Sequence, residues 1–333
     1  MPSLPKPRLR RGARSRTEAH APPASALEPR VEEVAHGGVR WLNIAEPGSG
    51  DQAWLEERFE FHPLAYEDVR SRNQRPKIDE YPDYVFIVLH FPVFDKAVGR
   101  LNAAELDVFL GPDFIITLPN APGLQALEYL YERCRTSEET RAQLFSKGTG
   151  YLLYKIVDDS IDGCFPMLRK MGNKLDRIEQ ELYAGESEEL VRDISNVKQE
   201  TINFRSIVRP QRVVLRDLER TKHRYLAEDL ELYFDDVVDA SERIWDMLET
   251  YKEKVEALED TNESVLSHRT NDALRALTSI SLILLPLTLI ASVFGMNVRV
   301  PGEGSLAAFW LVIAGMVVIL VGLVTYFRKQ KYL

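Results

Sequence analysis

The sequence predicts an α+β membrane protein with a soluble N-terminal α/β domain and two membrane-spanning helices at the C-terminus. Residues 276–298 and 304–327 carry no charged side chain. Each stretch is long enough to cross a hydrocarbon core of about 30 Å as a helix. Between residues 31 and 148, runs rich in β-branched and aromatic residues alternate with helical patterns. Residues 225–275 lack Gly and Pro, so we expect a long stalk helix that continues into the first span.

Charge and composition restrict the partners of this chain. Residues 1–30 are rich in Pro, Ala, Arg and Ser, and we expect them to form a disordered basic tail. The segment 228–263 holds 14 acidic residues against three basic ones, within a chain of net charge -9. An acidic chain without a stripe of basic and aromatic residues argues against nucleic acid. A cation is the better partner.

The residues that usually mark disulfides, metal cages or catalysis are sparse. Cys134 and Cys164 have no CxxC spacing, so we expect no disulfide framework and a soluble part in a reducing compartment. The six histidines include no pair four residues apart, which disfavours a zinc cage. The sequence has no Gly-rich phosphate loop, nucleophile elbow or His-Glu metal motif. We therefore expect no enzyme activity and no organic cofactor.

Turn signals divide the α/β domain, residues 31–148, into strands and short helices. The β-rich run that starts at Tyr84 is bounded by Pro92, where we expect it to end. Gly111-Pro112-Asp113 lies between two apolar runs, which predicts a hairpin. In chain order, we expect a strand at 39–44, helices at 51–60 and 64–72, a strand at 84–91, and strands at 106–110 and 114–118.

Residues 149–224 change to a helical pattern. We expect one helix over 150–184, broken near Pro166, and a second over 188–222, kinked or broken at Pro210. The stalk helix, 225–275, would then run unbroken into the first span for more than 60 residues. Its apolar positions predict packing against copies of itself or against neighbouring helices.

Flanking charge sets the expected topology. The spans are 276–298 and 305–327, joined by a short external loop, 299–304. Arg328, Lys329 and Lys331 crowd the last residues, 328–333, and positive residues stay cytoplasmic. We therefore expect a multi-pass protein of the cell membrane with both termini in the cytoplasm.

One face of the first span carries polar and small residues at three- and four-residue spacing. Two helices cannot enclose a water-filled path, so a conducting form would need several subunits around an axis, with this face inside. A helix–helix contact built from small residues explains the same spacing. The stripe consists of Thr278, Ser281, Leu285, Thr288, Ser292 and Gly295, with Asn271 and Leu274 extending it toward the stalk.

Gly295-Met296-Asn297, at the end of the first of two C-terminal spans, makes the chain resemble the CorA family of magnesium transport proteins. Pro286-Leu287-Thr288 and Gln74-Arg75-Pro76-Lys77 lie where the family has similar segments. The resemblance implies a homopentameric funnel in the lipid bilayer that passes hydrated Mg²⁺, with Co²⁺ and Ni²⁺ as further candidates. Asn297 would form a ring at the outer pore mouth, where its amide oxygen accepts hydrogen bonds from the water around the ion.

The resemblance also implies roles for residues along the pathway and in the soluble part. Asn271 and Thr288 would form polar rings. Leu274, Leu277 and Leu285 would form a hydrophobic constriction that gates by dewetting. Glu67, Asp68, Asp158 and Asp236 would form regulatory Mg²⁺ sites between neighbouring subunits, because a divalent ion relieves the repulsion between carboxylates.

Two features leave the ion open. Arg299 lies where many relatives of the family carry an acid, and Glu303 is the only acid of the loop. The zinc-transporting branch of the superfamily shares the Gly-Met-Asn motif, so a zinc transporter, with or without coupling to protons, is a second hypothesis. A membrane-anchored sensor without transport is a third, although an anchor needs neither the polar stripe nor Asn297.

Overall fold

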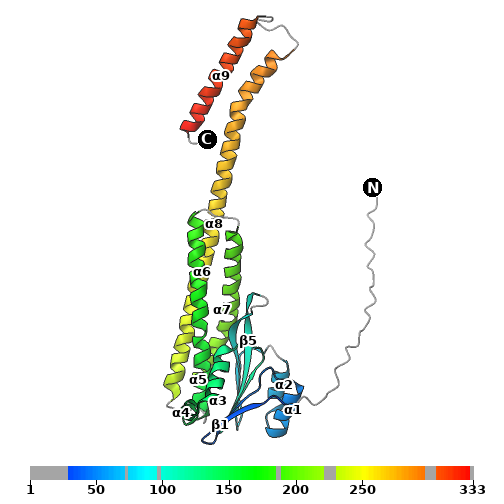
Figure 1. The fold of residues 1–333 in the computed structure, drawn as a ribbon, viewed down its shortest axis with the longest axis vertical. Helices are drawn as coiled ribbons and strands as arrows, with labels where there is room; N and C mark the ends of the chain where they lie inside the picture. Colours follow the sequence, from blue (N-terminus) through cyan, green and yellow to red (C-terminus); the bar gives the residue numbers. More distant parts are fainter. Residues whose placement is uncertain are drawn as a thin grey trace, which may run out of the picture. The chain divides into compact units, whose positions relative to one another are not determined.

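The computed structural model describes residues 29–71, 74–95, 99–184, 189–220, 230–296 and 305–330. Its described residues fall into two compact units. The first unit draws on the described residues within 29–93, 103–160 and 210–238. The second draws on the described residues within 94–102, 161–209 and 239–330. Figure 1 shows a sheet with flanking helices in the first unit and long helices in the second.

A six-stranded sheet with the order β1-β2-β6-β5-β4-β3 forms the centre of the first unit. β2 and β6 are parallel, and the predicted hairpin of β5 and β6 is antiparallel. The sequence pattern did not reveal β1, which pairs with β2 across Gly37 and Gly38, both at positive φ. It also missed the short edge strand β3. The strands are β1 Glu32–His36, β2 Val39–Asn43, β3 Lys77–Glu80, β4 Val85–Asp95, β5 Arg100–Leu110 and β6 Phe114–Pro119.

Alternate residues of the strands point to opposite faces of the sheet, and residues on both faces are buried. Helices α1, Ser49–Arg58, and α2, Pro63–Ser71, confirm the two predicted short helices and cover one face (Figure 1). Phe86 and Phe109 pack on this face with Tyr66 of α2. On the other face, the ring of Trp41 meets that of Tyr131 edge-on, with 5.0 Å between centroids.

The prediction that β4 ends at Pro92 was wrong, since the strand runs to Asp95. β3 pairs with β4 only as far as Val88. The next N–H on that side belongs to His90 and is satisfied by the side chain of Gln211, at 2.9 Å. Pro92 lies two residues after His90, so its backbone nitrogen points to the same side of β4. At that position β3 has already ended, so no partner strand needs the N–H that proline lacks. Proline is tolerated at such an edge.

Helices follow the sheet along the chain. Helix α5 ends at Asp162 and α6 begins at Cys164, so the break lies at Gly163 rather than at Pro166. Pro166 falls in the first turn of α6, where a helix does not need its N–H. These helices are α3 Gln125–Thr136, α4 Glu138–Phe145, α5 Thr149–Asp162 and α6 Cys164–Ala184.

Three helices build the core of the second unit. Helix α7, Leu190–Arg220, passes through Pro210 without a break. Leu175 and Ile178 of α6, Val197 of α7, and Val255 and Leu258 of α8 share one buried cluster. Ion pairs between these helices lie at the edge of the cluster. Lys254 Nζ lies 2.7 Å from a carboxylate oxygen of Asp176, and Lys198 Nζ lies 2.6 Å from one of Glu259.

Helix α8, Glu231–Phe294, confirms the predicted helix of more than 60 residues, because it has 64. Its C-terminal part and helix α9, Leu306–Lys329, are long and apolar enough to cross a membrane. Figure 1 shows α9 running beside that part of α8. Helix α9 starts at the N-cap Ser305, whose hydroxyl accepts a hydrogen bond from the N–H of Ala308.

Candidate functional site

The membrane-length part of α8 has one covered face within the single chain. Ser279 is 2% exposed and Ile283 6%. Ala276, Pro286 and Ile290 continue this face and are partly covered. At 100° per residue, the predicted polar stripe lies on roughly the opposite side of the helix. The contact within one chain therefore does not use the stripe.

All eight residues predicted to line a pore are exposed in the single chain. The three leucines are the most telling, since Leu274, Leu277 and Leu285 are 54%, 62% and 63% exposed in an apolar segment. Exposed leucines of this kind are available to lipid or to other copies of the chain. The eight residues are Asn271, Leu274, Leu277, Thr278, Ser281, Leu285, Thr288 and Ser292.

Two hydroxyls of the stripe are satisfied by the helix itself. Ser281 donates to the carbonyl of Leu277 and Thr288 to that of Leu285, each at 2.9 Å. Such bonds let Ser and Thr lie in an apolar environment. Because each hydroxyl oxygen keeps lone pairs, it can still accept a hydrogen bond from the water of a passing hydrated ion.

The predicted selectivity motif begins at the end of α8. The N–H of Gly295 still donates to the carbonyl of Ala291 at 2.9 Å, and Met296 is 58% exposed. A Cβ at Gly295 would lie 3.1 Å from that same carbonyl oxygen, so a larger residue would crowd the last turn. Asn297 and the loop 299–304 lie outside the described residues.

One candidate regulatory acid, Asp68 of α2, is held by a lysine of β3. Lys77 Nζ lies 2.6 Å from Asp68 Oδ2 and 2.7 Å from Asp79 Oδ2. Burial lowers the pKa of Lys77, but its hydrogen bonds to the two carboxylates outweigh burial and raise the pKa above the ordinary value. These residues line an open hollow of about 440 Å³ with Glu80 and Tyr81. Glu67, next to Asp68, points into solvent.

A second pair of candidate acids lies on α5 and at the start of α8. Lys155 Nζ lies 2.8 Å from Asp158 Oδ2. Asp236 is exposed on α8. An aromatic contact joins the two helices here, with 5.0 Å between the ring centroids of Tyr154 and Tyr233. Burial, followed by the charge of Asp158 and more weakly that of Asp236, raises the pKa of Tyr154 to about 12.

These acids provide only part of a cation shell in one chain. Among the residues that the structure describes, no three His, Cys, Asp or Glu side chains gather closely enough to hold a metal ion. The donor chemistry suits Mg²⁺, which prefers carboxylate oxygens and keeps several waters. A complete site would need ligands from a second subunit or from the solvent.

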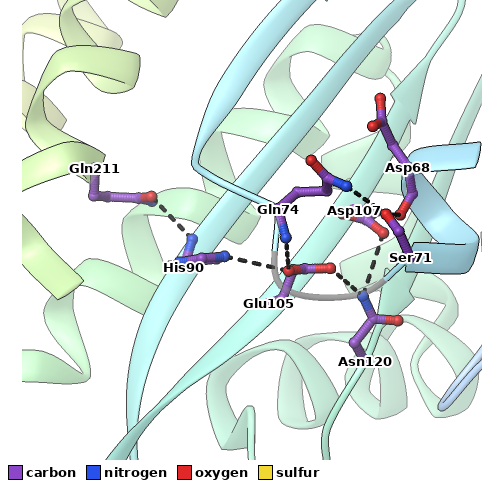
Figure 2. A network of polar contacts seen from close by, with 8 residues as sticks. All are labelled: Asp68, Ser71, Gln74, His90, Glu105, Asp107, Asn120 and Gln211. Carbon is purple, nitrogen blue, oxygen red and sulfur yellow. Dashed lines mark hydrogen bonds and ion pairs between the residues drawn. The ribbon is translucent and has the colours of Figure 1, made fainter. Parts of the chain in front are cut away.

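The sequence patterns did not reveal a buried polar network at the centre of the first unit, which Figure 2 shows. Glu105 Oε2 accepts from the backbone N–H of Gln74 at 2.9 Å and lies 3.4 Å from His90 Nε2. The amide of Asn120 reaches Glu105 Oε1 at 2.6 Å and Asp107 Oδ2 at 3.3 Å. The available signal was two acids, Glu105 and Asp107, in the otherwise apolar stretch 103–110 of β5.

The pKa values of the two acids in this network are shifted in opposite directions. Burial raises the pKa of Glu105, but hydrogen bonds with His90, Asn120 and Gln74 outweigh it and hold the pKa below its usual value. Asp107 is fully buried. Burial raises its pKa well above the usual range, and the charge of Glu105 adds to the shift. Its Oδ1 has no hydrogen-bond partner in the described part of the chain.

A soluble α/β unit, a helix that continues from it into a membrane-length segment and a second apolar helix define a two-span membrane protein. The exposed polar stripe suits membrane transport, and comparison with known proteins agrees. The family described as CorA-like Mg²⁺ transporter protein matches residues 36–329. The cobalt/magnesium transport protein CorA of Thermotoga maritima is 32% identical over 297 residues, 88% of this chain and 83% of that protein. The chain therefore belongs to the CorA-like Mg²⁺ transporter family, a family of divalent-cation transporters and not of enzymes.

More distant relatives extend the match over almost the whole chain. The cobalt/magnesium transport protein CorA of Methanocaldococcus jannaschii is 23% identical over 318 residues, 95% of this chain and 98% of that protein. The complete structure of the CorA magnesium transporter from that organism matches with a TM-score of 0.78 at 21% identity. It covers 91% of this chain and 94% of that one, which confirms the predicted fold class.

Proposed function

We propose that this protein is a Mg²⁺ channel in which five copies of α8 surround the pore and α9 forms the outer ring. The observation that carries the proposal is the position of the polar stripe, opposite the face that one chain covers. The chain belongs to a family of divalent-cation transporters, and a polar stripe exposed on a membrane-length helix is suited to line a path for such cations. Co²⁺ and Ni²⁺ are further candidate ions.

The proposed pathway combines weak polar contacts with an apolar constriction. Rings of Asn297, Thr288 and Asn271 would accept hydrogen bonds from the waters of a hydrated ion. Amide and hydroxyl oxygens do not strip Mg²⁺ of its water and bind it weakly enough for release. Rings of Leu274, Leu277 and Leu285 would close the pore when they exclude water.

We also assign regulation to the acids of the first unit. Glu67, Asp68, Asp158 and Asp236 would contribute to divalent-ion sites between neighbouring subunits on the cytoplasmic side. Bound Mg²⁺ would favour the closed arrangement, because an ion shifts an equilibrium only through its higher affinity for one state. The basic residues Arg328 and Lys329 in the last turn of α9 support a cytoplasmic location for both termini.

Flux into liposomes tests the transported ion. We expect reconstituted protein to take up Mg²⁺ down its gradient at a rate that a pH gradient leaves unchanged. Protein-free liposomes and liposomes with Asn297→Ala protein serve as controls. Faster Zn²⁺ uptake that requires a pH gradient would replace the proposal with a proton-coupled zinc transporter. Absence of uptake for Mg²⁺, Co²⁺ and Zn²⁺ alike would favour an anchored sensor.

A further inference from the structure

Two lysines of the first unit occupy positions between the proposed regulatory carboxylates and neighbouring acids. Lys77 Nζ lies 2.6 Å from Asp68 Oδ2 and 2.7 Å from Asp79 Oδ2. Lys155 Nζ lies 2.8 Å from Asp158 Oδ2 and 2.7 Å from an oxygen of Asp159. At both places a single ammonium group bridges two carboxylates. Each bridge supplies the positive charge that a divalent ion would otherwise supply.

The fold sets the geometry of both bridges. Lys77 and Asp79 point to the same side of β3 because they are two residues apart, and Asp68 reaches them from α2. Lys77 Nζ also lies 5.7 Å from the ring centroid of Phe86, which helps to place its side chain. Lys155 meets its partners at the i,i+3 and i,i+4 spacing of one helix face.

Partial burial makes these bridges more than loose surface pairs. The side chains of Asp68 and Asp158 are each 17% exposed, while Lys77 is 33% and Lys155 29% exposed. Charges in such positions are screened less than fully exposed ones. The hollow beside Lys77 nevertheless leaves room for solvent and for a hydrated cation near Asp68 and Asp79. The ammonium and the cation would compete for the same oxygens.

We propose that Lys77 and Lys155 are tethered counter-ions that compete with the regulatory divalent cation. The inference rests on the proposed regulatory role of Asp68 and Asp158. Each ammonium neutralises its carboxylates within one chain, so the carboxylates repel less when no Mg²⁺ is bound. Mg²⁺ must displace the ammonium group from these carboxylate oxygens, or share the oxygens with it, before it can join subunits. The two lysines thereby raise the Mg²⁺ concentration at which the channel closes.

Protease protection of the purified full-length protein across a Mg²⁺ titration tests this competition without relying on flux. Methionine keeps the length of lysine and removes its charge, so we compare Lys77→Met and Lys155→Met with wild type. We expect each to lower the Mg²⁺ midpoint by about two- to fivefold, the range of partly exposed ion pairs. Lys77→Arg keeps the charge and should retain the wild-type midpoint. Lys198→Met removes a lysine that pairs with Glu259 in the second unit and serves as the matched control.

Thermal unfolding provides a second measurement on the same variants. Without Mg²⁺, Lys77→Met should unfold at a lower temperature than wild type, because Asp68 and Asp79 then repel each other. Added Mg²⁺ should raise its Tm more than it raises that of wild type. A loss of Tm that Mg²⁺ does not reduce would show that Lys77 is only structural and would overturn the proposal.

The outcomes separate this inference from the function on which it rests. If Asp68→Ala and Asp236→Ala raise the midpoint but both lysine variants leave it unchanged or higher, the competition idea is wrong and the regulatory sites stand. If the aspartate variants also leave the midpoint unchanged, the regulatory role itself is wrong and both proposals fall. A lower midpoint in Lys198→Met as well would show a general effect of charge.

Discussion

Asn297 follows the last described turn of α8, where Met296 is already exposed. We expect Asn297→Ala to reduce Mg²⁺ flux to the level of protein-free liposomes, because the methyl group cannot accept a hydrogen bond from the hydrated ion. The oligomer should still assemble, as judged by gel filtration. Near-normal flux through an assembled Asn297→Ala protein would exclude a selectivity ring at this position.

Asp107 is a carboxyl group that the fold holds out of water. Its folded-state pKa is raised, mainly by burial, so the folded chain keeps a proton that the unfolded chain releases. The resulting stability is complete below the ordinary carboxyl pKa and is lost as the pH rises through the folded pKa. Asp107→Asn removes this dependence while its amide keeps a similar shape. We expect the Tm of Asp107→Asn, relative to that of wild type, to increase as the pH rises from 5 to 8.

Glu139→Gln provides the control for this pH profile, because it neutralises an exposed acid on α4. Its Tm should follow that of wild type across the same range. A constant difference between Asp107→Asn and wild type at all pH values would show that Asp107 does not release a proton on unfolding in this range.

At the level of elements, α8 is one helix with two kinds of surroundings. Its soluble part packs Val255 and Leu258 against other helices of the second unit. Its membrane-length part is mostly exposed in the single chain, apart from the narrow face of Ser279 and Ile283. Exposed apolar surface of this extent marks contact with lipid or with other subunits. The polar stripe of α8 lies opposite this covered face and is exposed in the single chain. This makes α8 a better candidate than α9 for the helix that lines the pore.

Cysteine accessibility distinguishes the two faces of α8. Thr288→Cys and Ser292→Cys should react with small aqueous thiol reagents in open channels, because their side chains would face water. Ile283→Cys on the covered face of the same helix should react at least about tenfold more slowly, as its thiol is buried. Ile319→Cys on α9 should also stay unreactive. Cys134 and Cys164 are buried, so they should add little background.

Faster labelling at Ile283 or Ile319 than at Thr288 would contradict the assignment. In that case α9, or a different face of α8, would line the pathway. Labelling without added Mg²⁺ favours the open state and keeps the comparison fair.

At the scale of the whole molecule, one helix carries both a proposed regulatory acid and the proposed pathway. Asp236 lies in the first turns of α8 and Thr288 near its end. A change in how subunits contact each other near Asp236 can therefore reach the membrane part through a continuous backbone. Five subunits would repeat the same contact, so small differences in each affinity add up in the gating equilibrium.

Removal of one carboxylate per subunit should weaken this regulation. We expect Asp236→Ala or Asp68→Ala to raise the Mg²⁺ concentration for half-inhibition of flux by about fivefold or more, since a ligand shifts a state only by its differential affinity. Maximal flux at low Mg²⁺ should stay unchanged, because neither residue lines the proposed pathway. Flux and protease resistance across a Mg²⁺ titration measure both effects. Unshifted curves would make these acids ordinary surface charge.

Local patterns were enough to predict the features that depend on nearby residues. The two apolar stretches, the long helix through Asp236 and the hairpin at Gly111 follow from hydropathy, helical periodicity and turn chemistry, which neighbouring residues set. The short strands β1 and β3 escaped because four or five residues carry too little pattern. The resemblance carried by Gly295-Met296-Asn297 led to the family that the comparisons then confirmed.

Only the tertiary structure could decide which of these side chains meet. The carboxylate of Glu105 accepts a hydrogen bond from the N–H of Gln74, 31 residues away in the sequence. The N–H of His90 donates to the side chain of Gln211, 121 residues away. The covered face of α8 and the bridge of Lys77 to Asp68 likewise depend on which elements lie side by side. Periodicity shows that a helix has two faces but not which one a neighbour covers. That choice comes from packing, where burial and pairing of distant residues set the free energy.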